Sequence, residues 1–585
     1  MSKGIHSIIA MQLAGLALLS VEAAAGPVIV VTTPVTTNLD DEDAVVLFDS
    51  GVEIRNESTV TTNGRSADGL RTSGIGARVT NTSTGVIVTT GDDFAVGIRT
   101  AGDEIHIENA GSITTSGING DGIIVFGNGN DEGRLIPREP QDFVGNSVVN
   151  SGTVEVSGVG ADGFVVEGDR TTLTNSGSII TNAGIRNGED NGTGAFFAGF
   201  ENQLNNSGLI ESTGVDSTTV RIFDQSTIRN TGSIINSGDK TPESTDFAAG
   251  KAITMAQTST LINSGNIDGD IAGSFGSQRV ELRSGSSISG TVDVSLFDEF
   301  LGSPANDELV VHLDQDESLN VSGDQYIGFD AFQKSGAGTL QLSDSLILSE
   351  TAQGRIEQGK LELNDGTLVL GDLLIESGGE LAGNGSVFGD IFVQTGGVLG
   401  PGFSPGQVDV FGNLTVENGG ILSVDFAGLG TGEFDFFNVS GIADLTGVII
   451  DINFLEPFLP TALDSINFLS ASSIIGLESA VFRTPGARGD LDFVVSNGIL
   501  GFTALSDFTR VPAPTTIGLL VLGSLGLLRR ARSKSGDRCC PASRIGQTLR
   551  GAARPQNAWT SSTGSPGLSV CTHSEAIRTP STLPA

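Results

Sequence analysis

Cysteine is missing from residues 1–538 of this 585-residue chain, since its three cysteines are Cys539, Cys540 and Cys571. The long body before them therefore has no disulfide, no thiolate metal site and no cysteine nucleophile. Backbone hydrogen bonds and apolar burial must hold it together.

Histidine and the larger aromatic residues are also scarce. His6 and His573 lie near the two ends, so a Ser-His-Asp site or a histidine-rich metal site in the body would need His106 or His312. Tyr326 is the single tyrosine, and the single tryptophan lies in the last 50 residues. Phenylalanine is expected to be mostly a core residue, so no binding platform is marked. These shortages argue against an enzyme and predict no catalytic residue.

Positive charge is rare as well, and it is unevenly placed. The whole chain has a formal net charge of −38, from 31 basic and 69 acidic residues. Residues 529–585 hold nine of the basic and two of the acidic residues, which leaves residues 1–528 at −45. Such an acidic body argues against nucleic acid and anionic lipid as partners. It suits solubility, divalent cations or a hydrated matrix.

The first 25 residues have the composition of a secretory signal peptide. Lys3 supplies the positive start, residues 8–19 supply an apolar stretch, and small residues from Ala23 to Ala25 supply a cleavage site. We expect the mature chain to start near Gly26 and to be exported.

Between residues 51 and 295 the chain repeats an Asn-Ser-Gly-x-Ile unit with small variations. The spacing between copies varies from 24 to 41 residues, and their first residues are Asn109, Asn150, Asn175, Asn206, Asn230 and Asn263. Short segments rich in Val, Ile and Thr alternate between them, which is typical of β-strands with one buried face. Glycine and asparagine tolerate positive φ at corners, and asparagines at matching corners of successive turns can hydrogen-bond along the axis.

A second unit is an Asp-Gly pair followed by apolar residues, at residues 68–69, 121–122 and 162–163. These pairs lack the Gly-Gly-x-Gly-x-Asp nonapeptide of calcium-bound rolls. Turn chemistry explains them without a ligand. We therefore expect no cofactor and no metal, with Ca²⁺ as an unsupported alternative.

These patterns predict an all-β chain that forms a parallel β-helix, or β-solenoid, because a single coil cannot bury its own apolar face but stacked coils can. A β-sandwich is the main rival, but it gives the recurring Asn-x-Gly no role. We assign solenoid repeats to residues 26–333, with looser coils over 296–333. Residues 451–510, rich in Phe, are expected to form a C-terminal cap.

Residues 334–450 carry a family resemblance. KSGAGTL at 334–340 and GFSPG at 402–406 resemble the autotransporter-associated β-strand repeat of bacterial surface proteins. The resemblance implies a right-handed β-helix displayed outside the cell. A true autotransporter also needs a membrane barrel of many strands, for which residues 451–510 are too few.

Residues 511–534, VPAPTTIGLLVLGSLGLLRRARSK, carry a second resemblance. They resemble the PEP-CTERM sorting signal, which implies recognition by an exosortase, a membrane transpeptidase, in a system associated with extracellular polysaccharide. By that resemblance the processing site is Pro512, Ala513 and Pro514, with Ala513 replacing the usual glutamate. A hydrophobic membrane helix would follow, and its cytoplasmic end would be held by the basic residues, which are Arg529, Arg530, Arg532 and Lys534.

The tail from 535 to 585 differs in composition from the body, and we expect it to be disordered, a product of readthrough or frameshift. A functional cytosolic tail is the alternative. Taken together, the sequence predicts an exported structural or adhesive protein of the cell surface or extracellular matrix, at least transiently membrane-anchored. A secreted β-helical lyase or glycosidase acting on polysaccharide is the alternative, for which only fold analogy speaks.

Overall fold

The chain folds as a parallel β-solenoid in the computed structural model, which describes residues 26–127, 145–183, 192–240, 248–295, 306–348, 353–402, 404–461, 464–484, 487–496 and 499–510. Through most of the body each strand pairs in parallel with the equivalent strand of the next coil, usually three strands later. The described residues contain many strands and short 3₁₀ turns but no α-helix. The predicted all-β class and parallel stacking are therefore confirmed. The expected helix within 511–534 and the expected disordered tail lie outside the described residues.

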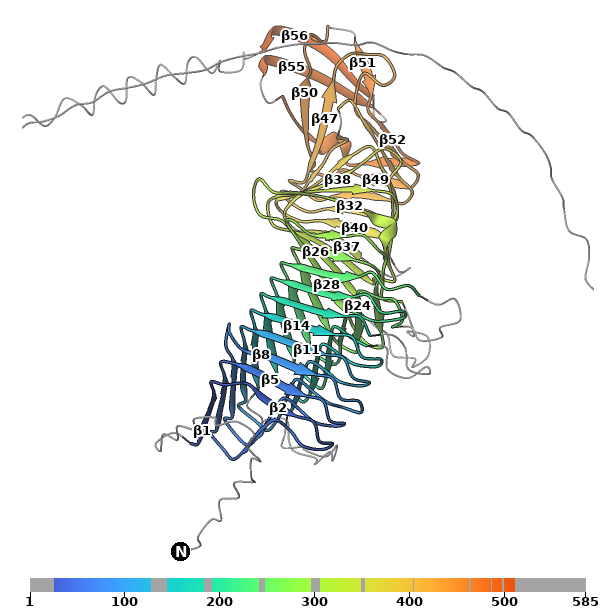
Figure 1. The fold of residues 1–585 in the computed structure, drawn as a ribbon. Coiled ribbons are helices and arrows are strands. Elements are labelled where there is room, and N and C mark those ends of the chain that lie inside the picture. The colour runs from blue at the N-terminus through green and yellow to red at the C-terminus, as the bar shows by residue number, and fades with distance from the viewer. Residues whose placement is uncertain are drawn as a thin grey trace, which may run out of the picture. The chain divides into compact units, whose positions relative to one another are not determined.

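Each coil contributes one strand to each of three sheets, and Figure 1 shows the coils stacked in sequence order. The first sheet, sheet A, runs from β1 (Val28–Val31) and β4 (Glu53–Asn56) to β53 (Ser473–Ile475). Sheet B runs from β2 (Val35–Thr37) to β29 (Ser287–Ile288), and sheet C from β3 (Val45–Phe48) to β33 (Tyr326–Ile327).

Two further sheets complete the later coils. Sheet D runs from β32 (Ser318–Ser322) to β54 (Val481–Arg483), and sheet E from β36 (Leu346–Ile347) to β52 (Leu469–Ser470). The last sheet is antiparallel and has the order β51 (Ser465–Asn467), β56 (Ile499–Arg510) and β55 (Ala487–Ser496).

Alternation along the strands builds the core. In β5 (Thr59–Thr62) and β19 (Gln203–Asn206) the second and fourth residues are buried, while the first and third are more accessible. Because successive coils pair in register, each buried residue stacks on its equivalent: Leu173 pairs with Leu204, which pairs with Ile228. The result is one continuous apolar core. Burial at about 25 cal/mol per Å² of apolar surface supplies the main driving force for this stacking.

An asparagine ladder runs up this core at the ends of the sheet A strands from β4 to β25 (Thr260–Asn263). Each Nδ2 donates to the Oδ1 of the next asparagine over 2.7–2.9 Å, in the order Asn56, Asn81, Asn109, Asn150, Asn175, Asn206, Asn230 and Asn263. The side chains are at most 2% exposed. The predicted axial hydrogen bonding of asparagine is confirmed.

Positive φ at corners is confirmed for glycine and asparagine, as at Gly74 (φ 128°), Gly102 (φ 137°) and Asn119 (φ 52°), but the Asn-Ser-Gly unit itself does not use it. The ladder asparagines end extended strands, and left-handed backbones occur at other corners, such as Arg170 (φ 53°) and Glu201 (φ 55°). Gly152 is needed for a different reason, since a Cβ there would lie 2.0 Å from the carbonyl oxygen of Gly111 in the preceding coil. Close stacking of coils therefore selects glycine two residues after the later ladder asparagines, from Asn109 to Asn263.

The solenoid has a junction that spans two successive coil interfaces, and only sheet A is continuous through both of them. Sheet A passes through it by way of β28 (Arg279–Arg283), β31 (Glu308–His312) and β34 (Ala331–Ser335). Sheet B ends at β29 and sheet D begins at β32, whereas sheet C continues from β30 (Val292–Asp293) to β33 and ends one coil later, where sheet E begins at β36. The asparagine ladder also ends here, because Leu282 is the next residue in register after Asn263.

A side chain bridges the break between β29 and β32. Gln325 lies in the 3₁₀ turn η2 (Gly323–Gln325), and its Nε2 donates to the carbonyl oxygens of Ile288 and Gly290 at 3.4 and 3.5 Å. Among the described residues, no main-chain hydrogen bond joins β29 to β32. The looser coils expected over 296–333 thus take a specific form, in which two sheets are interrupted.

Candidate functional site

The outward face of sheet C gathers the most unusual side chains of the described body. Its middle row is set by the register of successive strands and consists of Arg71, Arg99, Ile124, Val165, Phe196 and Arg221. These residues alternate with the buried core positions of the same strands. Charged and apolar side chains therefore share one surface, which we call the C face.

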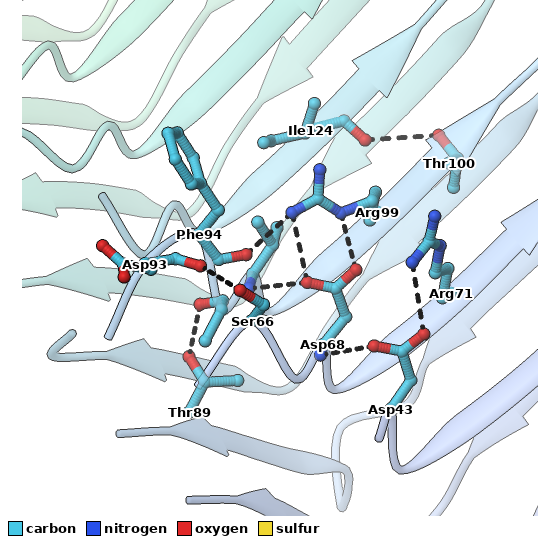
Figure 2. A network of polar contacts seen from close by, with 12 residues as sticks. Asp43, Ser66, Asp68, Arg71, Thr89, Asp93, Phe94, Arg99, Thr100 and Ile124 are labelled. Carbon is cyan, nitrogen blue, oxygen red and sulfur yellow. Dashed lines mark hydrogen bonds and ion pairs between the residues drawn. The ribbon is translucent and has the colours of Figure 1, made fainter. Parts of the chain in front are cut away.

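Aspartate–arginine pairs occupy the early part of the C face, as Figure 2 shows. The Asp68 carboxylate contacts Arg99 Nε at 2.6 Å and accepts the Val96 amide at 2.9 Å. One coil earlier, Asp43 contacts Arg71 Nη1 at 3.4 Å and accepts the Asp68 amide at 2.7 Å. The carboxylates thus cap amides of the next coil as well as pairing with arginines.

Burial outweighs pairing at these carboxylates. Desolvation raises the pKa of Asp68, which is 1% exposed, although Arg99 opposes the shift. Desolvation likewise raises the pKa of Asp43 against the effect of Arg71. Asp68 and the other predicted Asp-Gly positions use their carboxylates to hold neighbouring coils, since Asp121 and Asp162 also accept amides of the next coil.

Among the described residues, no group of three or more His, Cys, Asp or Glu is placed to hold a metal.

An apolar cluster follows along the C face, where Ile124, Val165 and Val96 are at most 6% exposed. Phe126 and Phe196 pack against this cluster. The Arg99 guanidinium lies 6.0 Å from the centre of the Phe126 ring, a cation–π distance.

An open pocket of about 220 Å³ lies further along the same face, at the ends of β18 (Ala195–Ala198) and β21 (Val220–Ile222). Its aromatic walls are Phe196, Phe200 and Phe223, and it is also lined by Ala198, Gly199, Asp224 and Gln257. The rings of Phe196 and Phe223 meet edge to face with centroids 5.8 Å apart. We call this the phenylalanine pocket.

The expectation that phenylalanine is mostly a core residue missed this pocket. Phe200 is 50% exposed, and Phe388 and Phe411 are exposed on sheet E, where their rings stack 4.1 Å apart. Phe197 is fully buried while Phe196 points outward, as strand alternation requires. The signal in the sequence was the FFAGF run at 196–200, since two adjacent phenylalanines in one strand cannot both face the core.

His312 lies beside a serine and an aspartate. Its Nδ1 is 3.0 Å from Ser335 Oγ, and its Nε2 is 3.6 Å from Asp314 Oδ1. Ser335 is its register partner on β34, and the Asp314 side chain is 82% exposed. An aspartate so exposed cannot hold the imidazole in a fixed orientation, so the arrangement is a cross-strand surface pair. His106 faces outward on sheet A, in register with Arg78 and Ser147.

No model of a protein family matches this chain, and no curated protein matches it. No helix among the described residues is long and apolar enough to cross a membrane. The predicted signal-cleavage residues Ala23 and Ala25 lie outside the described residues. So do the processing residues, the membrane segment and the basic cluster within 511–534.

Two sequence motifs within residues 334–450 have clear structural roles, and the first depends on Lys334. Its side chain is fully buried, and Nζ donates to the carbonyl oxygens of Ser335, Gly336 and Gln358 at 2.8–3.1 Å. Desolvation lowers its pKa to about 8. The lysine thereby fastens its own corner to the next coil.

We expect Lys334→Met to lower the free energy of unfolding by about 2–4 kcal/mol, because it removes the three hydrogen bonds of the buried ammonium group, although Ser335 O still accepts the Leu313 amide. The urea midpoint of the full chain measures this. Lys360→Met is the matched control: Lys360 pairs with Glu380 on the surface, and its loss should cost less than about 1 kcal/mol. Equal losses in the two variants would contradict the role of Lys334.

The second motif depends on Asp435, which is 1% exposed. Its two carboxylate oxygens accept the amides of Gly406 and Asp425 at 2.7 and 2.8 Å. Gly406 ends the Ser-Pro-Gly element, so the carboxylate joins that element to the next coil. Desolvation raises the pKa of Asp435 to about 7, and the two amides offset only part of this.

The raised pKa of Asp435 predicts a pH effect. In the unfolded chain the group loses its proton near pH 4, so between about pH 4 and 7 the folded state binds more protons. The stabilisation from this group is therefore complete below about pH 4 and lost as pH rises to 7. Asp435→Asn should remove this pH dependence of stability. The test compares the urea midpoints of the wild type and the variant at a series of pH values over 4.5–8. Parallel profiles would contradict it.

Proposed function

We propose that this protein is exported and serves as a structural or adhesive component of the cell surface or extracellular matrix. The observation that carries the structural role is the asparagine ladder. It joins successive coils from β4 to β25 (Thr260–Asn263) through buried side chains and uses no cysteine. A body held in this way stays folded whatever the redox state of its surroundings.

Export and sorting rest on the two ends of the sequence. The signal-like residues 1–25 would direct secretion, and residues 511–534 would be read by an exosortase-type membrane transpeptidase. Pro512, Ala513 and Pro514 would be the processing site, and the four basic residues from Arg529 to Lys534 would keep the end of the segment in the cytoplasm. The expected partner outside the cell is an extracellular polysaccharide or another surface.

We further propose that the solenoid is right-handed. Connections between parallel strands of one sheet are right-handed in nearly all proteins, because twisted strands pack back onto the sheet in that sense. This handedness also agrees with the autotransporter-like motifs of residues 334–450.

Surface retention tests the proposal. Deleting residues 511–534 should release the protein from the cells that produce it, and replacing Pro512 and Pro514 by alanine should block its processing. Deleting residues 541–585, which spares the basic cluster, is the control and should leave retention unchanged. Retention that survives deletion of 511–534 would refute the sorting role. Depolymerisation of any acidic polysaccharide by the purified chain would favour the enzyme alternative.

A further inference from the structure

We propose that the phenylalanine pocket on the C face binds a single neutral pyranose ring of a polysaccharide. The pocket holds about 220 Å³, which is smaller than the ~300–1,000 Å³ of pockets for drug-sized ligands. A ligand of one ring fits this size. The inference rests on the proposed extracellular function only for the source of the sugar. The binding itself does not require that function.

The walls of the pocket match the apolar side of a pyranose. Phe196 and Phe223 come from adjacent coils and lie nearly perpendicular, with an interplanar angle of 81°. Phe200 adds a half-exposed ring at the corner that follows β18. The axial C–H groups of a sugar ring are apolar and slightly positive, so they pack favourably on the negative faces of aromatic rings. Exposed phenylalanines gathered in a concave site are otherwise unfavourable in water.

Two features hold the walls in place before a ligand arrives. The Arg221 guanidinium carbon lies 5.8 Å from the Phe196 centroid and 5.3 Å from the Phe223 centroid, so it contacts both rings. Phe197, next to Phe196, is fully buried and packs on Phe164 with centroids 5.6 Å apart. The strand that carries Phe196 is therefore fixed by the core, and little conformational entropy would be lost on binding.

Hydroxyl groups of a bound ring can stay in contact with water, because the pocket is open. Asp224 and Gln257 are among its lining residues, but its accessible lining is almost wholly apolar, so binding depends chiefly on the aromatic rings. The Gln257 backbone is fixed, since its amide donates to Ser274 O at 2.9 Å and its carbonyl accepts Gln278 Nε2 at 2.6 Å. Its exposed side chain can thus approach a ligand from a rigid corner.

Charge favours a neutral sugar over an acidic one. Residues 1–528 carry a net charge of −45, and Asp224 is one of the lining residues, whereas Arg221 places one positive charge against two of the pocket rings. The net charge of the body therefore disfavours a uronic acid or a sulfated sugar.

Titration calorimetry of the full-length chain tests the inference. The probes are neutral gluco-, manno- and galacto-oligosaccharides, with oligogalacturonate as the acidic probe. We expect at least one neutral probe to bind with a Kd of about 1 mM or tighter, near −4 kcal/mol. Phe200→Ala and Phe223→Ala should each weaken this binding about tenfold or more. Phe411→Ala removes an equally exposed ring on sheet E and should change nothing.

Three outcomes would overturn the inference: no neutral probe binds, the two pocket variants bind like the wild type, or oligogalacturonate binds more tightly than any neutral probe. Unchanged circular dichroism and thermal midpoints show that the variants fold. Failure of the proposed function can be told apart from failure of this inference, because surface retention is measured on cells and sugar binding on the purified chain.

Discussion

Replacing Asn206 by alanine is expected to lower the free energy of unfolding by about 2–4 kcal/mol, because buried polar partners are left unpaired. Asn206 accepts from Asn175 Nδ2, donates to Asn230 Oδ1 and contacts the carbonyl oxygens of Gly208 and Ser233. Its side chain is 2% exposed, so water cannot replace these bonds. Urea unfolding followed by circular dichroism measures the loss.

Asn205→Ala provides a control in the same strand. Asn205 precedes Asn206 in β19 but points to the outside, where it is partly exposed. Its replacement should change stability by no more than about 0.5 kcal/mol. Equal losses for the two variants would mean that the ladder contributes no special stability.

The damage from Asn206→Ala should also be local. In a stack of repeats each coil contacts only its neighbours, so stability is close to a sum of coil and interface terms. We expect faster amide exchange in the coils of Asn175 and Asn230 than in those of Asn56 and Asn81. Uniformly faster exchange along the whole body would contradict this expectation.

Unfolding of the body is expected to proceed in two steps that separate at the junction around β29 and β32. Elsewhere three sheets join neighbouring coils, but between β29 and β32 only sheets A and C continue, and one coil later, between β33 and β36, only sheets A and D continue. The Gln325 side chain supplies two long hydrogen bonds in place of a main-chain ladder. Interfaces with fewer contacts open first in repeat proteins.

Single-molecule stretching of the full chain measures this separation directly. The force trace should show two groups of events, whose released lengths correspond to the coils before and after the junction. Gln325→Ala should lower the force at which the two parts separate and leave later events unchanged. Gln333→Ala, which removes an outward side chain of β34 in sheet A, is the control. One cooperative event, or unzipping that starts only at the ends, would contradict the prediction.

The parallel stacking and most of the ladder could be read from the sequence. Strand alternation showed which residues face inward, and the recurring Asn-x-Gly showed where coils correspond. Asn56 and Asn81 were missed because they are followed by Glu57 and Thr82 rather than by the Ser-Gly pattern of later copies. Their role depends on register, which the structure supplies.

The junction and the phenylalanine pocket could not be predicted in the same way. Whether β29 pairs with β32 depends on the path of the chain through a whole coil, which no local pattern encodes. The pocket combines Phe196 and Phe223, which are separated by a coil and meet only because β18 and β21 are in register. Lys334 was found as part of a motif, but its three carbonyl partners emerge only from the stacking of two coils.

The intact mass of the protein purified from the cells that produce it tests the central claim most directly. An exported and sorted protein should begin near Gly26 and should have been cut near Pro514, so its mass should lack residues 1–25 and the residues from about 515 to 585. A mass that accounts for the whole chain from Met1 to Ala585 would contradict both export and sorting.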